Sequence, residues 1–325
     1  MKPDFSLLLH VMNDDMIKPQ VRKKYYARMM DTYRESPVHI PYLNALMRYT
    51  LTTKARRNIR RIKKEYADSD DIIERWFGQR KTVFFGLGFF RSGTTFLADF
   101  LNKSVSDVIV QHEPNLIDYY YYATAIQNPA GTYAYIKDYR LREIYNRMLY
   151  YGIKGYGEIN PFLGRHCIAL KQYCPDAKQF HLVRDGRDVL RSLMSRKFFG
   201  TNHFWTPLIQ PPQEDAYFEK WGELSRFEKI CWLWKSDNEY LRNNVEHLVQ
   251  FEKLLSDYDY FKLAIIDYLD IENIDADVWQ KSVSKTKNET PVHSFPHFNN
   301  WDDNEKKIFE KICGEEMFKL GYQIV

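Results

Sequence analysis

Short apolar runs alternate with amphipathic stretches along the chain after residue 80. Each run is followed by a glycine-rich or polar segment, and this pattern is typical of short strands that are buried on both faces of a sheet. The predicted strands are Val83–Leu87, Val108–Val110, Gln179–Val183 and His247–Phe251.

The stretches between these strands have helical periodicity. The apolar side chains of Thr94–Lys103 fall on one side of a helix. Further helices are predicted through Val189–Met194, over Glu223–Asn243 and over Trp301–Leu320, with Gly321 as the stop of the last one. Strands that alternate with helices predict an α/β fold, with a P-loop-like parallel sheet flanked by helices on both faces.

Residues 1–78 differ from the rest because they have a polar, helical pattern ahead of the first strand. We therefore expect two parts: an N-terminal helical extension over residues 1–78 and an α/β domain over residues 79–325. A basic run lies in the extension between Arg56 and Lys64. It is either a solvated helix face or a rim that attracts an anionic acceptor or a membrane surface.

Composition narrows the class of protein. Of the 325 residues, 44% are apolar and 28% are charged, which indicates a soluble globular chain. A net charge of +4 permits an anionic cofactor, and we expect no nucleic-acid partner. No apolar stretch has the length of a membrane span, so we expect a soluble, cytoplasmic protein without a transmembrane segment. The cysteines lack zinc-type spacing, and we expect them to be buried thiols: Cys167, Cys174, Cys231 and Cys313.

The segment Gly86–Thr95 follows a buried strand and opens a helix, a context in which backbone N–H groups and the helix dipole bind an anion. Gly93 lets the backbone approach that anion closely. Gly88 and Gly93 have the spacing of the nucleoside-triphosphate loop, but Thr94 occupies the lysine position and Arg91 is the cation. The alternatives are a P-loop kinase or NTPase, or an ordinary turn between a strand and a helix.

A second candidate phosphate site lies about ninety residues further along the chain. Arg184 ends a predicted strand, and Ser192 follows eight residues later in the next helix. The guanidinium of arginine offers a fork of donors that matches a phosphate group. Asp185 is placed to cap the helix between them.

These motifs resemble those of the sulfotransferases that use 3'-phosphoadenosine 5'-phosphosulfate (PAPS), in the style of carbohydrate, tyrosylprotein and bacterial members. The resemblance covers residues 81–325 and implies PAPS as the donor, PAP as the product and no required metal. RSGTTFL at Arg91–Leu97 is similar to the family's 5'-phosphosulfate loop, and FHLVRDGRDVLRS at Phe180–Ser192 to its 3'-phosphate segment. The cofactor-binding residues that it implies are Arg91, Ser92, Gly93, Thr94, Thr95, Arg184 and Ser192, with Lys285 and Lys287 from a late loop.

Sulfuryl transfer to a hydroxyl needs a base to accept the proton, worth on the order of 10²–10⁴ in rate. Glu113 directly follows a predicted strand, at the edge of the sheet where ligands bind, and the resemblance implies this role for it. Glu158 is the rival, in a segment where the small-molecule branch of the family carries a Lys-Thr-His-type sequence. His112 would point away from Glu113 if both lay on a strand. We expect Arg91 to stabilise the negative charge of the departing oxygen.

A carbohydrate hydroxyl is the expected acceptor, because of the Glu113 motif and the missing Lys-Thr-His-type segment. A peptide tyrosine and a small-molecule alcohol stay open, as does a non-catalytic binder of an anionic polymer. The tyrosines at Tyr119–Tyr122 either line the acceptor cleft or pack in the core. His293 and His297 have the spacing of a metal pair, but Pro296 disfavours the helix that would align them, and we expect no metal site.

Overall fold

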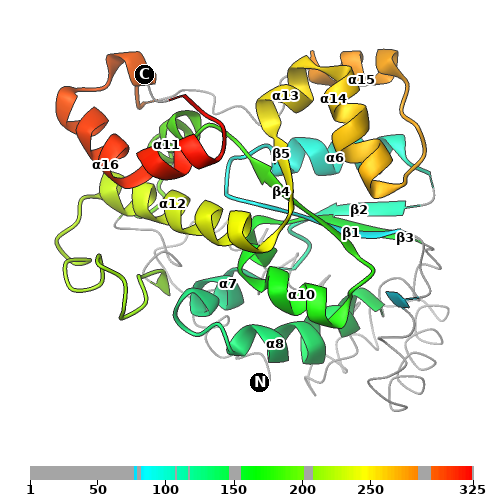
Figure 1. Ribbon diagram of the computed structural model, residues 1–325, viewed down its shortest axis with the longest axis horizontal. Coiled ribbons are helices and arrows are strands. Elements are labelled where there is room, and N and C mark those ends of the chain that lie inside the picture. The colour runs from blue at the N-terminus through cyan, green and yellow to red at the C-terminus, as the bar shows by residue number, and fades with distance from the viewer. Residues whose placement is uncertain are drawn as a thin grey trace, which may run out of the picture.

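The computed structural model describes residues 77–78, 82–106, 108–115, 118–145, 155–200, 208–284 and 294–323. Within these ranges the chain forms a five-stranded parallel sheet with helices on both faces (Figure 1). The predicted α/β class is therefore confirmed. The predicted N-terminal extension, with its basic run, lies outside the described residues except for Phe77 and Gly78.

The strand order in the sheet is β2-β3-β1-β4-β5. β1 (Val83–Gly88) lies in the centre, between β3 (Gly155–Ile159) and β4 (Lys178–Val183). The edge strands are β2 (Val108–His112) and β5 (His247–Gln250). Because all strands are parallel, their carboxyl ends meet at one edge, where the segments after β1, β2, β3 and β4 come close together.

One face of the sheet is covered by α6 and by helices from the last third of the chain (Figure 1). Phe100 of α6 packs on Phe261, with ring centroids 5.5 Å apart, and on the apolar residues of the central strands. The elements of this layer are α6 (Thr94–Ser104), α13 (Phe251–Ser256), α14 (Tyr258–Phe261), the π-helix η4 (Lys262–Asp267) and α15 (Ala276–Val283).

The other face is covered by helices from the middle of the chain and from its C-terminal end, with α12 running across it (Figure 1). Trp232 and Trp234 of α12 are buried in this layer, as expected of core residues. Its elements are α7 (Asp118–Gln127), α8 (Gly131–Tyr135), the π-helix η1 (Ile136–Arg140), the 3-10 helix η2 (Pro161–His166), α10 (Cys167–Tyr173), α11 (Gly186–Met194), α12 (Arg226–Asn244), η5 (Phe298–Asn300) and α16 (Asp303–Lys319).

Two predicted helices begin later than expected because of their caps. α12 begins after Ser225, which forms a capping box with Glu228. α16 begins after Asp302, which does the same with Glu305. The predicted stop of the last helix is confirmed, since Gly321 has a left-handed backbone with φ of 83°.

β3 is the strand that the hydrophobic pattern did not predict. Gly155 and Gly157 interrupt its apolar residues, and Glu158 places a charge in its middle. A side chain at Gly157 would overlap the ring of Phe84 on the neighbouring strand, so the glycine provides room for that ring. All four cysteines are free and buried, as predicted. Within the described ranges, no helix has both the length and the apolar character needed to cross a bilayer.

Candidate active site

The turn between β1 and α6 has the backbone of an anion-binding loop. Gly93 caps α6 in a left-handed conformation, with φ of 89°. Only glycine fits at this position, because a Cβ there would overlap the ring of Phe251. Arg91 also has a positive φ, of 67°, which is uncommon for a residue with a side chain. The first N–H groups of an eleven-residue helix therefore open onto this turn.

The two predicted phosphate motifs are in direct contact. Arg91 donates a hydrogen bond from Nε to Oγ of Ser192, at 2.9 Å, across 101 residues of sequence. Arg184 donates from Nη1 to the carbonyl oxygen of Arg91, at 3.2 Å. Ser192 is nearly fully buried on α11, and Asp185 accepts a hydrogen bond from the N–H of Arg187 as the predicted cap of that helix. The two predicted anion motifs therefore meet at the carboxyl ends of β1 and β4.

Positive charge is concentrated in this region. Burial, together with the positive charges of Arg196 and Arg184, lowers the pKa of Arg91 to about 10, while the negative charge of Glu113 acts against this shift. Arg91 remains protonated at neutral pH, so three guanidinium groups repel one another here. A bound anion relieves that repulsion, which favours binding of a phosphate or sulfate group.

Arg184 is held from two further sides. Its Nη2 donates to Oδ2 of Asp188 at 3.1 Å, and its guanidinium lies over the ring of Phe251, 5.7 Å from the centroid. Phe251 is the same ring that contacts Gly93. One aromatic side chain at the start of α13 therefore packs against both the turn after β1 and the arginine after β4.

The loop also carries hydroxyl groups suited to an anion. Ser92 is fully buried, and its Oγ has no hydrogen-bond partner in the described part of the chain. Thr94 and Thr95 contact Nε2 of His112 through their Oγ1 atoms, at 3.0 and 3.3 Å. A buried hydroxyl without a partner is unusual, and here it lies beside Gly93, where a side chain would not fit. Both features fit a loop that binds an anionic group.

Glu113 lies next to this loop. It follows β2 with a φ of 44°, and its Oε1 lies 3.6 Å from Nε2 of His112. The condition under which His112 would point away from Glu113 is not met, because β2 ends at His112 and Glu113 has a left-handed backbone. The side chain of Glu113 is 27% exposed, so a substrate hydroxyl has access to its carboxylate. His112 is a site residue that the strand argument underrated.

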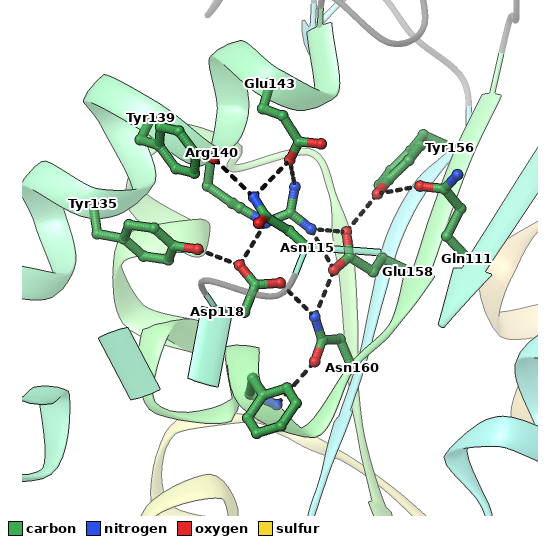
Figure 2. A network of polar contacts seen from close by, with 11 residues as sticks. Gln111, Asn115, Asp118, Tyr135, Tyr139, Arg140, Glu143, Tyr156, Glu158 and Asn160 are labelled. Atoms are coloured by element: carbon green, nitrogen blue, oxygen red, sulfur yellow. Dashed lines mark hydrogen bonds and ion pairs between the residues drawn. The ribbon is translucent and has the colours of Figure 1, made fainter. Parts of the chain in front are cut away.

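Glu158 lies inside a network of polar side chains (Figure 2), unlike Glu113. It is fully buried, and both its carboxylate oxygens accept hydrogen bonds from Nη2 of Arg140, at 2.6 and 2.7 Å. Asn160 donates to the same carboxylate at 2.8 Å, and the hydroxyl of Tyr156 donates to it as well. The carboxylate is thus engaged on all sides by groups of the chain itself.

Two more carboxylates surround Arg140. Asp118 accepts from Nε of Arg140 at 3.0 Å and from Asn160 at 2.9 Å, and Glu143 accepts from Nη1 of Arg140. We call Asp118, Arg140, Glu143 and Glu158 the buried carboxylate cluster. It contains three carboxylates and one guanidinium, all fully buried. Burial raises the pKa of Asp118 to about 7 although Arg140 opposes the rise, so this excess of acidic groups holds a proton near neutral pH.

The network around the buried carboxylate cluster includes Gln111 and Asn115, which lie on either side of Glu113 in the sequence (Figure 2). Asn115 donates from Nδ2 to the hydroxyl of Tyr139 at 3.1 Å and to Glu143 at 3.5 Å. Before Glu113, Gln111 accepts a hydrogen bond from the hydroxyl of Tyr156 at 3.4 Å. Both flanks of Glu113 are therefore tied to residues of the cluster or to their direct partners. Sequence reasoning nominated neither Arg140 nor Asp118, because no motif marks them.

The remaining predicted residues either pack in the core or lie outside the described ranges. Three of the four tyrosines at Tyr119–Tyr122 are buried in the core, and Tyr120 is half-buried. Lys285 and Lys287 lie outside the described residues, as does His293. Within the described ranges, no three His, Cys, Asp or Glu side chains are grouped so as to hold a metal ion.

Comparisons with known proteins gave structural matches alone. No protein-family model matches the chain, and no curated protein matches it. Similar solved structures include the sulfotransferase STF9 from Mycobacterium avium, with 11% identity and a TM-score of 0.48 over 100% of this chain and 98% of that chain. They also include the sulfotransferase domain from the curacin biosynthetic pathway, with 15% identity and a TM-score of 0.41 over 75% of this chain and 99% of that chain. The chain is thus similar, at low identity, to two structures that bear the name sulfotransferase.

Proposed function

We propose that this protein is a sulfotransferase that moves a sulfuryl group from PAPS to an acceptor hydroxyl, with a carbohydrate as the acceptor. One observation carries the proposal. Arg91 of the first anion motif is bonded to Ser192 of the second, and Arg184 is bonded to the backbone of Arg91. A donor with a phosphosulfate at its 5' position and a phosphate at its 3' position needs two anion-binding motifs side by side, and these contacts place the two motifs so.

The residues of the turn fit the 5' end of such a donor. PAPS supplies an activated sulfuryl group on a leaving phosphate. The N–H groups at the start of α6, with the hydroxyls of Ser92, Thr94 and Thr95, are placed to bind its charged oxygens. Arg184 and Ser192 are assigned to the 3'-phosphate, and Lys285 and Lys287 remain predicted contacts.

Arg91 is assigned a role in the chemical step. Negative charge grows on the oxygen that bridges phosphate and sulfur as the sulfuryl group departs. A guanidinium that is fixed by Ser192 stabilises this charge more in the transition state than in the ground state. Its partial burial strengthens the effect, because screening by water is weaker there.

Glu113 is assigned as the base that takes the proton of the acceptor hydroxyl. Its carboxylate is partly exposed and lies beside His112, which contacts the hydroxyls of the phosphate loop. Glu158 is fully buried and engaged by Arg140, which supports a role in positioning the Glu113 segment instead. The carboxylate closer to the loop and open to a substrate is therefore the better base.

Transfer of radiolabelled sulfate from PAPS tests the proposal, with neutral glycans, phenols and tyrosine peptides as acceptors. We expect label on a glycan, and we expect PAP to raise the melting temperature of the protein more than ATP with magnesium does. Stabilisation by ATP with magnesium alone would assign the chain to the kinases. Transfer to a phenol or a peptide, with none to a glycan, would keep the sulfotransferase and reject the carbohydrate.

A further inference from the structure

A cavity of about 500 Å³ lies on the side of α7 away from the phosphate loop. Tyr121, Thr124 and Asn128 project into it from one face of the helix. The opposite face carries Tyr122, whose ring packs against Phe90 of the loop at 5.4 Å. α7 therefore separates this cavity from the site where the two anion motifs meet.

Most of the cavity's lining surface is apolar, and no charged side chain lines it among the described residues. Amide groups come from Gln127, Asn128 and Gln210, and hydroxyl groups come from tyrosine and threonine side chains. The rings of Tyr120 and Tyr121 lie edge to face, with centroids 5.3 Å apart, and supply apolar surface. Aromatic rings beside neutral hydrogen-bonding groups suit a ligand that has both an apolar face and hydroxyl groups.

His166 points to a ligand independently of the cavity's shape. Its side chain lines the cavity and is 1% exposed, yet neither ring nitrogen has a hydrogen-bond partner in the described part of the chain. Buried polar groups are nearly always paired, so this imidazole is unusual. Burial, together with the positive charge of Arg140, lowers the pKa of His166 to about 3, and the ring is therefore neutral. A neutral imidazole offers one N–H donor and one acceptor nitrogen.

We propose that this cavity binds a neutral sugar unit of the glycan acceptor, with His166 bonded to its hydroxyl groups and the tyrosine rings against its apolar face. A sugar hydroxyl both donates and accepts, so it can bond either to the N–H or to the acceptor nitrogen of a neutral imidazole. Because none of the described lining residues is charged, the cavity favours an unsulfated, non-acidic unit. The inference rests on the proposed function for its choice of ligand, but its test requires no turnover.

Imidazole nitrogen NMR spectra of the full chain, labelled with ¹⁵N and saturated with PAP, test this site. The probes are cellobiose, lactose and N,N'-diacetylchitobiose, with glucuronic acid as the charged comparison. We expect at least one neutral disaccharide to shift the His166 signals, and His166→Leu to weaken its binding at least about tenfold with the affinity for PAP unchanged. Because neither buried ring nitrogen has a hydrogen-bond partner, His166→Leu is also expected to raise the melting temperature of the free protein.

His181→Leu is the matched control. His181 is also fully buried, but its Nε2 bonds to Asn238 at 3.0 Å, so this variant is expected to lower the melting temperature and leave disaccharide binding unchanged. Tyr120→Ala, at a half-buried position of the lining, provides a second variant that is expected to weaken binding. The inference is overturned if no neutral disaccharide shifts the His166 signals, if glucuronic acid binds as well as they do, or if both variants bind normally. Failure of PAP to bind, with the His166 shift intact, overturns the proposed function and leaves the sugar site standing.

Discussion

Nη1 of Arg184 donates a hydrogen bond to the main-chain carbonyl oxygen of Arg91, at a distance of 3.2 Å. One residue ends β4 and the other lies in the turn after β1, and these strands are neighbours in the sheet. The contact means that the two anion motifs are positioned by each other and by the sheet. Substitution of either residue is therefore expected to weaken donor binding. Ligands that lack one of the two phosphates can show which phosphate each residue binds.

Arg184→Ala is expected to weaken PAP binding by on the order of 10²-fold, because a charge-assisted pair with the 3'-phosphate is lost. Binding of adenosine 5'-phosphosulfate, which has no 3'-phosphate, should fall much less. Calorimetric titration of both ligands measures this difference. An equal loss for the two ligands would show that Arg184 acts on the 5' end or only through the backbone of Arg91.

Arg91→Ala is expected to lower kcat by on the order of 10²–10³, as is seen when other preorganised donors to a developing charge are removed. The Kd of PAP should change less than kcat, since the product carries no sulfuryl group. Single-turnover transfer from labelled PAPS, together with PAP titration, measures the two effects. Near-normal turnover would remove Arg91 from the mechanism.

Glu113→Gln is expected to reduce kcat by on the order of 10²–10⁴ and to leave the melting temperature and the Kd of PAP unchanged. Glu158→Gln is the matched comparison, because it changes a buried carboxylate that accepts from Arg140. Its stability should fall by about 1–3 kcal/mol, and its kcat should fall less than that of Glu113→Gln. The reverse pattern, with turnover lost only in a stable Glu158→Gln protein, would exchange the two roles.

The raised pKa of Asp118 predicts a pH dependence of stability. The group has a pKa near 3.8 in the unfolded chain and about 7 in the folded protein, so the folded state holds more protons between these values. Its contribution to stability is therefore present at low pH and is lost as the pH rises towards 7. The slope expected from one such group is roughly 1.4 kcal/mol per pH unit.

Urea unfolding of the wild type and of Asp118→Asn, between pH 5 and pH 8, isolates this contribution. The wild type should lose stability relative to the variant as the pH rises, because the variant has no proton to release at this position. A constant difference between the two proteins across the range would mean that Asp118 does not hold the proton of the buried carboxylate cluster.

The fold class followed from sequence because the strands and helices have clear periods. Four of the five strands were predicted near their observed bounds. β3 was not, because glycines interrupt its apolar pattern, and one of them, Gly157, makes room for the ring of Phe84. The two predicted anion motifs could be found because each consists of a few residues at a fixed spacing from the end of a predicted strand. Their contact depends on β1 and β4 being neighbours, which no local pattern specifies.

The surroundings of the candidate base could not be predicted in the same way. The orientation of His112 depends on the left-handed backbone of Glu113. Because of it, the strand ends at His112, so the alternation of side chains in a strand does not extend to Glu113. Arg140 and Glu158 are 18 residues apart and meet through tertiary packing. The lack of hydrogen-bond partners for the ring nitrogens of His166 can be recognised only when the positions of the surrounding residues are known.

The position of β1 has a consequence for how the protein loses its ligand. This strand is the middle one of the sheet, and all six of its residues are buried. Amide groups in such a strand exchange with solvent only when the whole domain opens, whereas outer helices open more readily. The proposed donor loop, which is the turn between β1 and α6, therefore directly follows the strand that is expected to open last. Partial opening that spares α6 and α11 is expected to leave the donor bound, and denaturation should end binding and structure together.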